Sequence, residues 1–325
     1  MIASYASGKI INHDPLIVIS KIHTPHQPLG LVSVAPEVFK SKPSIVFLSP
    51  SWWLGDVLEE IVEAMNDALI QMPLTHFVIL VNDQDEAFLA SRAGIDYCFG
   101  NSQIFINDEL YHPDDSVLEQ YDAVYHAIFT PFKNHELSRS INRLALIHQR
   151  YDAKPQEEDY VRQMLPKATI INEPNGVESY QQLNQAQVSR AINTAKVGLS
   201  LSSIDGANNE VMEYLLCGTP VVSVECKGGK NLMLTDAFAE IVEPDPGCVL
   251  LAVERMILRS PSRKDIRQMA SSILSLERRN FLEGFHVRVE ELFGNAYLED
   301  NFSKLIDCFE WKSTEEWNIL FNQSN

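Results

Sequence analysis

Residues 197–230 read VGLSLSSIDGANNEVMEYLLCGTPVVSVECKGGK, and this stretch decides the fold. The apolar segment Val197–Ser202 is typical of a buried strand, and it ends in the polar turn Asp205-Gly-Ala-Asn-Asn209. A short helix over Glu210–Cys217 is predicted to end at Gly218, because glycine favours the left-handed conformation just beyond a helix. A second apolar segment then opens another strand. A strand, a helix and a strand in this order predict a parallel sheet.

The same alternation of apolar and amphipathic segments runs through most of the chain. The predicted strands are Ser44–Leu48, His76–Val81, Tyr97–Ile106, Ala123–Phe129, Ala168–Ile171, Val197–Ser202 and Pro220–Ser223. The predicted helices are Asp56–Met72, Glu86–Ala93, His135–Leu146, Glu157–Met164, Gln185–Ala195 and Glu210–Cys217. Residues 1–40 are expected to be irregular or edge-strand structure.

These elements predict an α/β protein with two doubly wound, Rossmann-like domains that face each other across a cleft. The expected domains are residues 1–120 and residues 121–262, the second of which carries the stretch quoted above. Residues 263–325 are predicted to form a helical tail, with packing back on the N-terminal domain as one arrangement. The apolar face of this tail is expected to contain Ile266, Met269, Ile273 and Leu276.

Composition narrows the function classes. Hydrophobic residues make up 45% of the 325 residues and charged residues 22%, which is typical of a globular protein with a sizeable core. The net charge of −18, without any segment rich in Lys and Arg, argues against nucleic acid and anionic membranes as partners. No apolar run approaches the ~20 residues that cross a bilayer, and the N-terminus lacks the apolar core of a signal peptide.

The cysteines indicate a reducing environment. They are scattered, odd in number and never spaced as C-x-x-C, so neither a disulfide framework nor a zinc site is expected. A cytoplasmic location fits this pattern. The five cysteines are Cys98, Cys217, Cys226, Cys248 and Cys308.

The turn after the strand Val197–Ser202 is the expected binding site, because ligands of open α/β sheets bind beyond the carboxyl ends of strands. Asn208 or Asn209 is expected to cap the helix, whose first N–H groups and dipole favour an anion. Glu213, about one turn into the helix, would accept hydrogen bonds from a ribose. A second glycine turn, Lys227-Gly-Gly-Lys230, follows the next strand and is expected beside the first.

The segment Asp205–Val222, which reads DGANNEVMEYLLCGTPVV, resembles the signature of glycosyltransferase family 4 and related GT-B enzymes. That signature is Glu, seven residues and Glu, followed by Gly-x-Pro-Val-Val. The resemblance is specific over residues 190–250 and vaguer across 121–150. It implies that Glu213 binds the ribose of a nucleotide and that Asp205, in place of the first Glu, faces the donor sugar. It also implies donor contacts for Gly206, Ala207, Asn208, Asn209, Gly228, Gly229 and Lys230.

Relatives also carry Arg, four residues and Lys, two cations that hold the donor diphosphate. Here Lys133 matches, and Ile128 stands at the position of the arginine. Isoleucine offers neither the charge nor the bidentate fork of a guanidinium, so Lys230 or Arg139 would have to compensate.

The resemblance implies a glycosyltransferase that moves a sugar from a nucleoside-diphosphate sugar to a small-molecule or glycan acceptor. It implies hexosyl transfer with retention, without metal or cofactor, and with Asp205 and Lys133 as catalytic residues. Ile128 leaves open an alternative, a catalytically weakened homologue that binds a sugar nucleotide or a protein. A dinucleotide enzyme is disfavoured because no G-x-G-x-x-G follows an early strand.

The acceptor is expected in turns of the N-terminal domain. The candidate residues are Trp52, Trp53, Gly55, Asn101 and Gln103. Packing of one or both tryptophans in the domain core is an equally open interpretation. Asp83-Gln-Asp85 has the spelling of a metal motif, but a helix start is favoured there, so no metal is expected. The histidines expected to be structural or surface residues rather than bases are His112, His126, His135 and His148.

Overall fold

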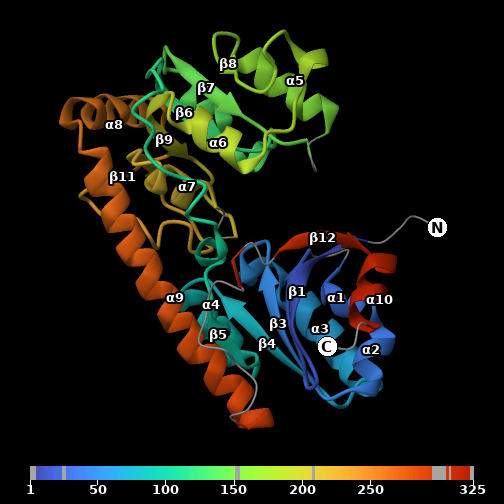
Figure 1. Cartoon of the computed structure of the whole chain (residues 1–325). Helices are drawn as coiled ribbons and strands as arrows, with labels where there is room; N and C mark the ends of the chain where they lie inside the picture. Colours follow the sequence, from blue (N-terminus) through green and yellow to red (C-terminus); the bar gives the residue numbers. More distant parts are fainter. Residues whose placement is uncertain are drawn as a thin grey trace. The chain divides into compact units, whose positions relative to one another are not determined.

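The computed structural model divides into two compact units, each described here by itself (Figure 1). Unit 1 comprises residues 1–106, 205–207 and 275–325, and unit 2 comprises residues 107–204 and 208–274. Each unit is built on one sheet with helices packed on it, which confirms the predicted α/β class. The residues that the structure describes are 5–23, 27–150, 154–206, 209–294, 305–306 and 309–322.

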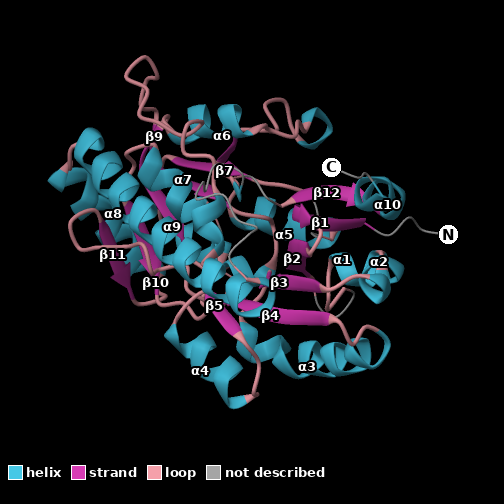
Figure 2. Ribbon diagram, turned by 60° about the horizontal axis from the view of Figure 1, so that its bottom comes forward, coloured by secondary structure: helices cyan, strands magenta, loops and turns pink. Residues whose placement is uncertain are grey.

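The sheet of unit 1 has a parallel block and an antiparallel edge. The parallel strands are β2 (Leu16–Ile22), β3 (Ser44–Pro50), β4 (Thr75–Val81) and β5 (Tyr97–Phe99). Antiparallel to them lie β1 (Tyr5–His13), which pairs with β2, and β12 (Glu310–Ser313), which pairs with β1. Figure 2 shows β12, β1, β2, β3 and β4 side by side in this order. The buried apolar runs of β2 and β3 follow from helices that cover both faces of the sheet.

One face of this sheet packs on five helices of unit 1. They are α1 (Leu31–Val34), α2 (Pro36–Ser41), α3 (Leu54–Gln71), α4 (Gln84–Arg92) and α10 (Thr314–Asn322). The other face packs on the C-terminal part of the long helix α9 (Arg263–Phe293), where the rings of Phe47 and Phe285 lie 4.4 Å apart. Helix α3 is amphipathic, with Ile61 fully buried on its apolar face.

The sheet of unit 2 is parallel throughout, in the order β11-β10-β9-β6-β7-β8. The chain fills one half with β6, β7 and β8 and the other half with β9, β10 and β11. The winding therefore reverses between β6 and β9, as in a doubly wound Rossmann sheet. The strands are β6 (Tyr121–His126), β7 (Leu144–Ile147), β8 (Thr169–Ile170), β9 (Ala195–Ser200), β10 (Val221–Val224) and β11 (Ala239–Val242).

Helices cover both faces of this sheet as well. One face packs on α5 (Pro155–Met164) and α8 (Pro246–Arg259), and the opposite face packs on α6 (Gln185–Ile192) and α7 (Glu210–Leu216). Gly198 of β9 allows Tyr214 of α7 to lie against the strand, because a Cβ at residue 198 would come 2.4 Å from the tyrosine ring. The short 3₁₀ turns are η1 (Ser102–Phe105), η2 (Pro131–Lys133), η3 (His135–Ser138) and η4 (Val177–Ser179).

Several expectations about local structure are wrong. Within residues 1–40, β1 and β2 are regular strands, and β2 lies in the interior of the sheet. The helix expected over His135–Leu146 is the turn η3 followed by β7, since a short apolar run does not by itself distinguish a helix from a strand. The strand expected over Tyr97–Ile106 ends at Phe99 and continues into η1.

The C-terminal segment also differs from its prediction. It is not wholly helical, because β12 joins the sheet of unit 1. Along α9, Met269 and Leu276 are exposed rather than buried. The side chains that α9 buries are Ile266, Ala270, Leu274, Phe281, Phe285 and Val289. Their spacing of four residues, with one step of seven, rotates the buried line away from the expected face. The division between the units falls after residue 106, whereas a boundary after residue 120 was expected.

Candidate functional site

Four charged side chains gather at the carboxyl ends of β6 and β9 in unit 2. His126 is the last residue of β6, Lys133 ends η2 shortly after it, and Glu210 and Glu213 lie on α7, which follows β9. Their side chains are only 11%, 7%, 7% and 10% exposed, respectively. We name these four residues the switch-point cluster, because the strand order reverses between β6 and β9 and ligands bind doubly wound sheets at such a point.

Both carboxylate oxygens of Glu213 have partners. The hydroxyl of Tyr111 donates to Oε1 at 3.0 Å, and Nδ1 of His126 lies 2.7 Å from Oε2. The backbone N–H of His126 donates to the hydroxyl of Tyr214 at 2.7 Å, which fixes the end of β6 against α7. A carboxylate can accept about four hydrogen bonds, so a carboxylate with two partners still has acceptor capacity for hydroxyl groups of a ligand.

Lys133 and Glu210 form the second pair of the switch-point cluster. Nζ of Lys133 lies 3.7 Å from Oε2 of Glu210, and Oγ of Ser200 donates to Oε1 at 3.1 Å. Two hydrogen bonds hold the C-terminal end of the turn that carries Lys133: Tyr125 donates to the Lys133 carbonyl at 2.6 Å, and Asn134 donates to the carbonyl of residue 201 at 2.9 Å. The ammonium group is therefore held beside the ends of β6 and β9.

The charges of the switch-point cluster shift the pKa of His126. Burial lowers this pKa, but the charge of Glu213, its hydrogen bond and the charge of Glu210 outweigh burial, while Lys133 opposes them. The pKa of His126 is therefore raised above its usual 6.5. A protonated imidazole is favoured at this position.

The remaining predicted donor residues lie on other elements. Lys230 is fully buried, and its ammonium donates to the Ser200 carbonyl at 2.7 Å and to Oγ of Ser223 at 3.2 Å, which ties β9 to β10. Gly228 and Gly229 have φ angles of 103° and 82°, so their turn requires glycine. The contact of Lys230 with the donor stays a prediction.

The turn after β9 is described in part. Asp205 and Gly206 are buried and group with unit 1, while Ala207 and Asn208 lie outside the described residues. Asn209 stands at the start of α7 but makes no capping hydrogen bond through its side chain. Of the two residues named as caps, this leaves Asn208 as the prediction. Gly218 has a φ of 70° beyond the end of α7, which confirms its predicted position.

The predicted acceptor residues belong to unit 1. Trp52 packs partly on the core and donates from its indole nitrogen, at 3.0 Å, to a carboxylate in the first turn of α3. Trp53 immediately precedes α3, and Gly55 is exposed in its first turn. Asn101 is buried and accepts a hydrogen bond from the backbone of Gln103, which is fully buried. Their contact with an acceptor stays a prediction.

Sequence analysis missed a buried carboxylate in unit 1, Glu86. It accepts hydrogen bonds from the backbone N–H groups of Leu54 at 3.0 Å and of Asn82 at 2.7 Å. Glu86 therefore supplies an acceptor for an N–H group in the first turn of α3. Asp83 caps α4 by accepting from the backbone of Glu86 at 2.9 Å, which confirms that Asp83-Gln-Asp85 is a helix start. The helix that follows β3 therefore binds a carboxylate of the protein itself.

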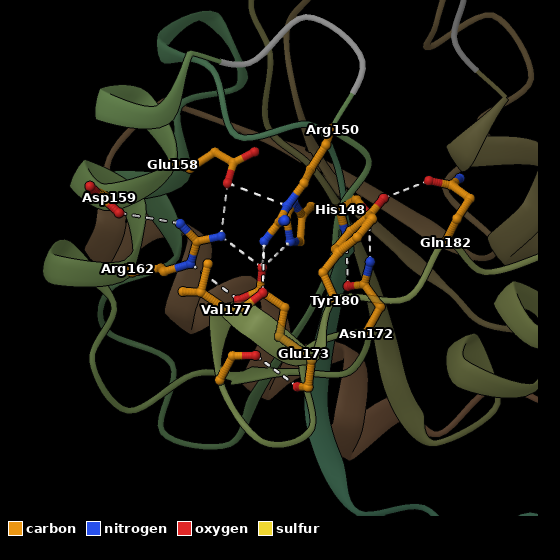
Figure 3. A network of polar contacts seen from close by, with 12 residues as sticks. His148, Arg150, Glu158, Asp159, Arg162, Asn172, Glu173, Val177, Tyr180 and Gln182 are labelled. Carbon is orange, nitrogen blue, oxygen red and sulfur yellow. Dashed lines mark hydrogen bonds and ion pairs between the residues drawn. The ribbon is translucent and has the colours of Figure 1, made fainter.

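Glu173 is a further buried carboxylate of unit 2 and follows β8 in the sequence. Figure 3 shows its side chain among those of His148, Arg150 and Arg162. It accepts hydrogen bonds from His148 at 2.9 Å, Arg150 at 2.9 Å and Arg162 at 2.7 Å. Burial raises the pKa of Glu173, but these hydrogen bonds, first that of Arg162, outweigh burial and lower the pKa to about 2. Arg150 also lies over the ring of Tyr180, 4.2 Å from its centroid. We name Glu173 and its three donors the Glu173 network.

No described helix has both the length and the apolar character needed to cross a membrane. Within the described residues, no three His, Cys, Asp or Glu side chains lie so that they could hold a metal ion together. The four cysteines that the structure describes are free thiols.

No family model and no curated protein sequence matches the chain. Solved structures do match its fold. The α,α-trehalose 6-phosphate synthase of Burkholderia multivorans superposes with a TM-score of 0.55 at 14% identity, over 85% of this chain and 69% of that chain. The structure of Anabaena HepE in complex with UDP superposes with a TM-score of 0.54 at 12% identity, over 86% of this chain and 100% of that chain. The sucrose-phosphate synthase of Thermosynechococcus elongatus superposes with a TM-score of 0.52 at 14% identity, over 87% of this chain and 68% of that chain. The chain has the fold of the GT-B glycosyltransferases, which confirms the predicted fold class.

Proposed function

We propose that the chain is a glycosyltransferase whose donor, a nucleoside-diphosphate sugar, binds at the switch-point cluster. The observation that carries this proposal is the position of Lys133, His126 and Glu213 at the carboxyl ends of β6 and β9 in a doubly wound sheet. The fold supports it, since HepE, a protein of similar fold, was solved with UDP and with UDP and glucose.

Each residue has a stated part in the proposal. Lys133 stabilises the charge of the leaving diphosphate, which grows as the glycosidic bond breaks. Glu213 accepts hydrogen bonds from the ribose, and Asp205 faces the donor sugar. Lys230, bound to Ser200 and Ser223, holds the strands together. Backbone contacts to the donor come from Gly206, Ala207, Asn208, Asn209, Gly228 and Gly229.

The reaction is proposed as a retaining hexosyl transfer that needs neither metal nor cofactor. The acceptor, a small molecule or glycan, is proposed to meet the residues of unit 1 named above. The scattered cysteines support a reducing, cytoplasmic compartment.

Ile128 favours a second candidate, a homologue that binds a sugar nucleotide without efficient transfer. Its half-buried aliphatic side chain supplies no charge at the position where the family that the sequence resembles has an arginine. A charge-assisted hydrogen bond contributes about 1.5–3 kcal/mol, so its loss weakens the stabilisation of a diphosphate.

A melting experiment tests both candidates. UDP-, GDP-, ADP- and TDP-glucose are added separately, and at least one is expected to raise the melting temperature, because a ligand that binds only the folded state stabilises it. No shift with any of the four contradicts both candidates. Hydrolysis or transfer of the sugar by the wild-type protein then supports the enzyme, whereas binding without turnover supports the second candidate.

A further inference from the structure

The two ring nitrogens of His126 have different surroundings. Nδ1 lies 2.7 Å from Oε2 of Glu213. Within the described chain Nε2 makes no hydrogen bond, and it is not among the enclosed polar atoms without a partner. His135 is a contrast in the same unit, because both of its ring nitrogens are enclosed without a partner. The ring of His126 therefore offers one N–H to the protein and keeps a second nitrogen for a ligand.

The charged groups that face His126 come from two elements. Glu213 and Glu210 lie on α7, and Lys133 lies on η2. Two carboxylates and one ammonium give a formal charge of −1 when the imidazole is neutral, and a proton on His126 brings the sum to zero. A diphosphate linked to two sugars carries two negative charges. The cluster therefore binds a diphosphate more readily when His126 is protonated than when its imidazole is neutral.

We propose that His126 is a donor-binding residue: its Nδ1–H orients the carboxylate of Glu213, and its protonated Nε2 contacts the donor diphosphate beside Lys133. This inference rests on the proposed function. Residue 128 is Ile and supplies no charge, so the titrating side chain of His126 supplies a cation for the diphosphate.

Donor affinity then depends on pH. Because the pKa of His126 lies above 6.5, the imidazole is charged at pH 6, and it loses its charge as the pH rises through its raised pKa. The pKa of His135 is lowered to about 3 by burial and by the nearby charges of Lys133 and His148, and that of His148 is lowered by its burial. His135 therefore stays neutral at pH 6 and above. The lowered pKa of His148 favours its neutral ring, whereas the raised pKa of His126 favours its charged ring.

The test is calorimetric titration with the nucleotide sugar that stabilises the protein, chosen from UDP-, GDP-, ADP- and TDP-glucose. Their diphosphates are esterified at both ends and do not titrate in this range. We expect the affinity of the wild-type protein to fall about tenfold between pH 6 and 8.5, as loss of one charged contact implies. The matching nucleoside, which has no phosphate, is expected to bind equally at both values.

His126→Asn is the informative variant, because an amide can still donate to Glu213 but cannot gain a proton. Its affinity is expected to be independent of pH, to match the wild type within about twofold at pH 8.5, and to be about tenfold weaker at pH 6. The matched control is His76→Asn, which removes a histidine paired with Asp96 in unit 1 and should keep the wild-type slope.

The outcomes separate this inference from the proposed function. No binding of any nucleotide sugar contradicts the proposed function and this inference together. Binding with a flat wild-type profile, or a His126→Asn variant with the wild-type slope, overturns the inference alone. If His126→Asn does not fold, Glu210→Gln replaces it: removal of one facing carboxylate should move the midpoint of the profile to lower pH, and an unmoved midpoint overturns the inference.

Discussion

Two buried carboxylates in the described part of unit 2 each bind a histidine, and their surroundings differ. Glu173 is held by His148 and by the guanidinium groups of Arg150 and Arg162, and its side chain is 2% exposed. Glu213 is held by a tyrosine hydroxyl and by His126, and its side chain is 10% exposed. The fixed charges of two arginines fill the acceptor sites of Glu173, whereas Glu213 has one titrating partner and spare acceptor capacity. The comparison teaches that fixed cations mark a structural network, whereas spare acceptor capacity favours a binding site.

Replacement of Glu173 gives the largest expected effect. Glu173→Ala leaves His148, Arg150 and Arg162 without their shared acceptor. We expect the free energy of unfolding to fall by about 3–5 kcal/mol, as for other broken buried ion pairs. Denaturant titration measures this change. The folded fraction should still bind the nucleotide sugar within about twofold of the wild type. A loss below about 1 kcal/mol would show that the Glu173 network is not structural.

Acid should act on the same network. The pKa of Glu173 is about 2 in the folded protein, below its usual 4.5, so its contribution to stability is present above pH 4.5 and is lost as the pH falls through about 2. We expect a loss on the order of 2 kcal/mol over this interval. Unfolding of the wild type and of Glu173→Gln at pH 5 and pH 3 measures the difference, and parallel pH profiles of the two proteins would contradict the assignment.

The fold was largely predictable from sequence, because buried parallel strands form apolar runs and amphipathic helices repeat at helical spacing. The strand Leu144–Ile147 was not predictable, because four apolar residues fit a strand or a helix and only pairing with β6 decides between them. The strand β12 was missed for a related reason: Glu310–Ser313 becomes a strand through pairing with β1, some 300 residues earlier in the sequence.

The candidate site was predictable in part. Glu213 and Lys133 were predicted from a resemblance to a known motif, and the structure places them on neighbouring elements of one unit. Tyr111 was missed because it lies in an irregular segment, and no periodicity indicates that its hydroxyl reaches Glu213 over 102 residues of sequence. His126 was expected to be structural. Its position at the end of a strand was the available signal, since ligands bind at strand ends.

The switch-point cluster should respond to substitution in ligand affinity rather than in stability. Glu213→Ala and Lys133→Ala are each expected to weaken binding of the nucleotide sugar about tenfold or more, as loss of a charged hydrogen bond implies. Calorimetric titration of the folded variants measures this change. Lys167→Ala, at an exposed lysine of unit 2, is the matched control and should leave affinity unchanged. Wild-type affinity in both cluster variants would remove the site assignment.

Tyr111→Phe gives the smallest expected effect. It removes one neutral hydrogen bond to Glu213 and leaves His126 to orient the carboxylate. A contribution of about 1 kcal/mol corresponds to roughly fivefold weaker binding of the nucleotide sugar. The same titration measures it. An effect as large as that of Glu213→Ala would mean that Tyr111, rather than His126, holds the carboxylate in its binding orientation.

A crystal structure with a bound nucleotide sugar tests the central claim most directly. The account predicts that the diphosphate lies beyond the carboxyl ends of β6 and β9, within hydrogen-bonding distance of Lys133 and His126, with the ribose at Glu213. A diphosphate bound to Arg150 and Arg162 of the Glu173 network, or away from unit 2, would contradict it.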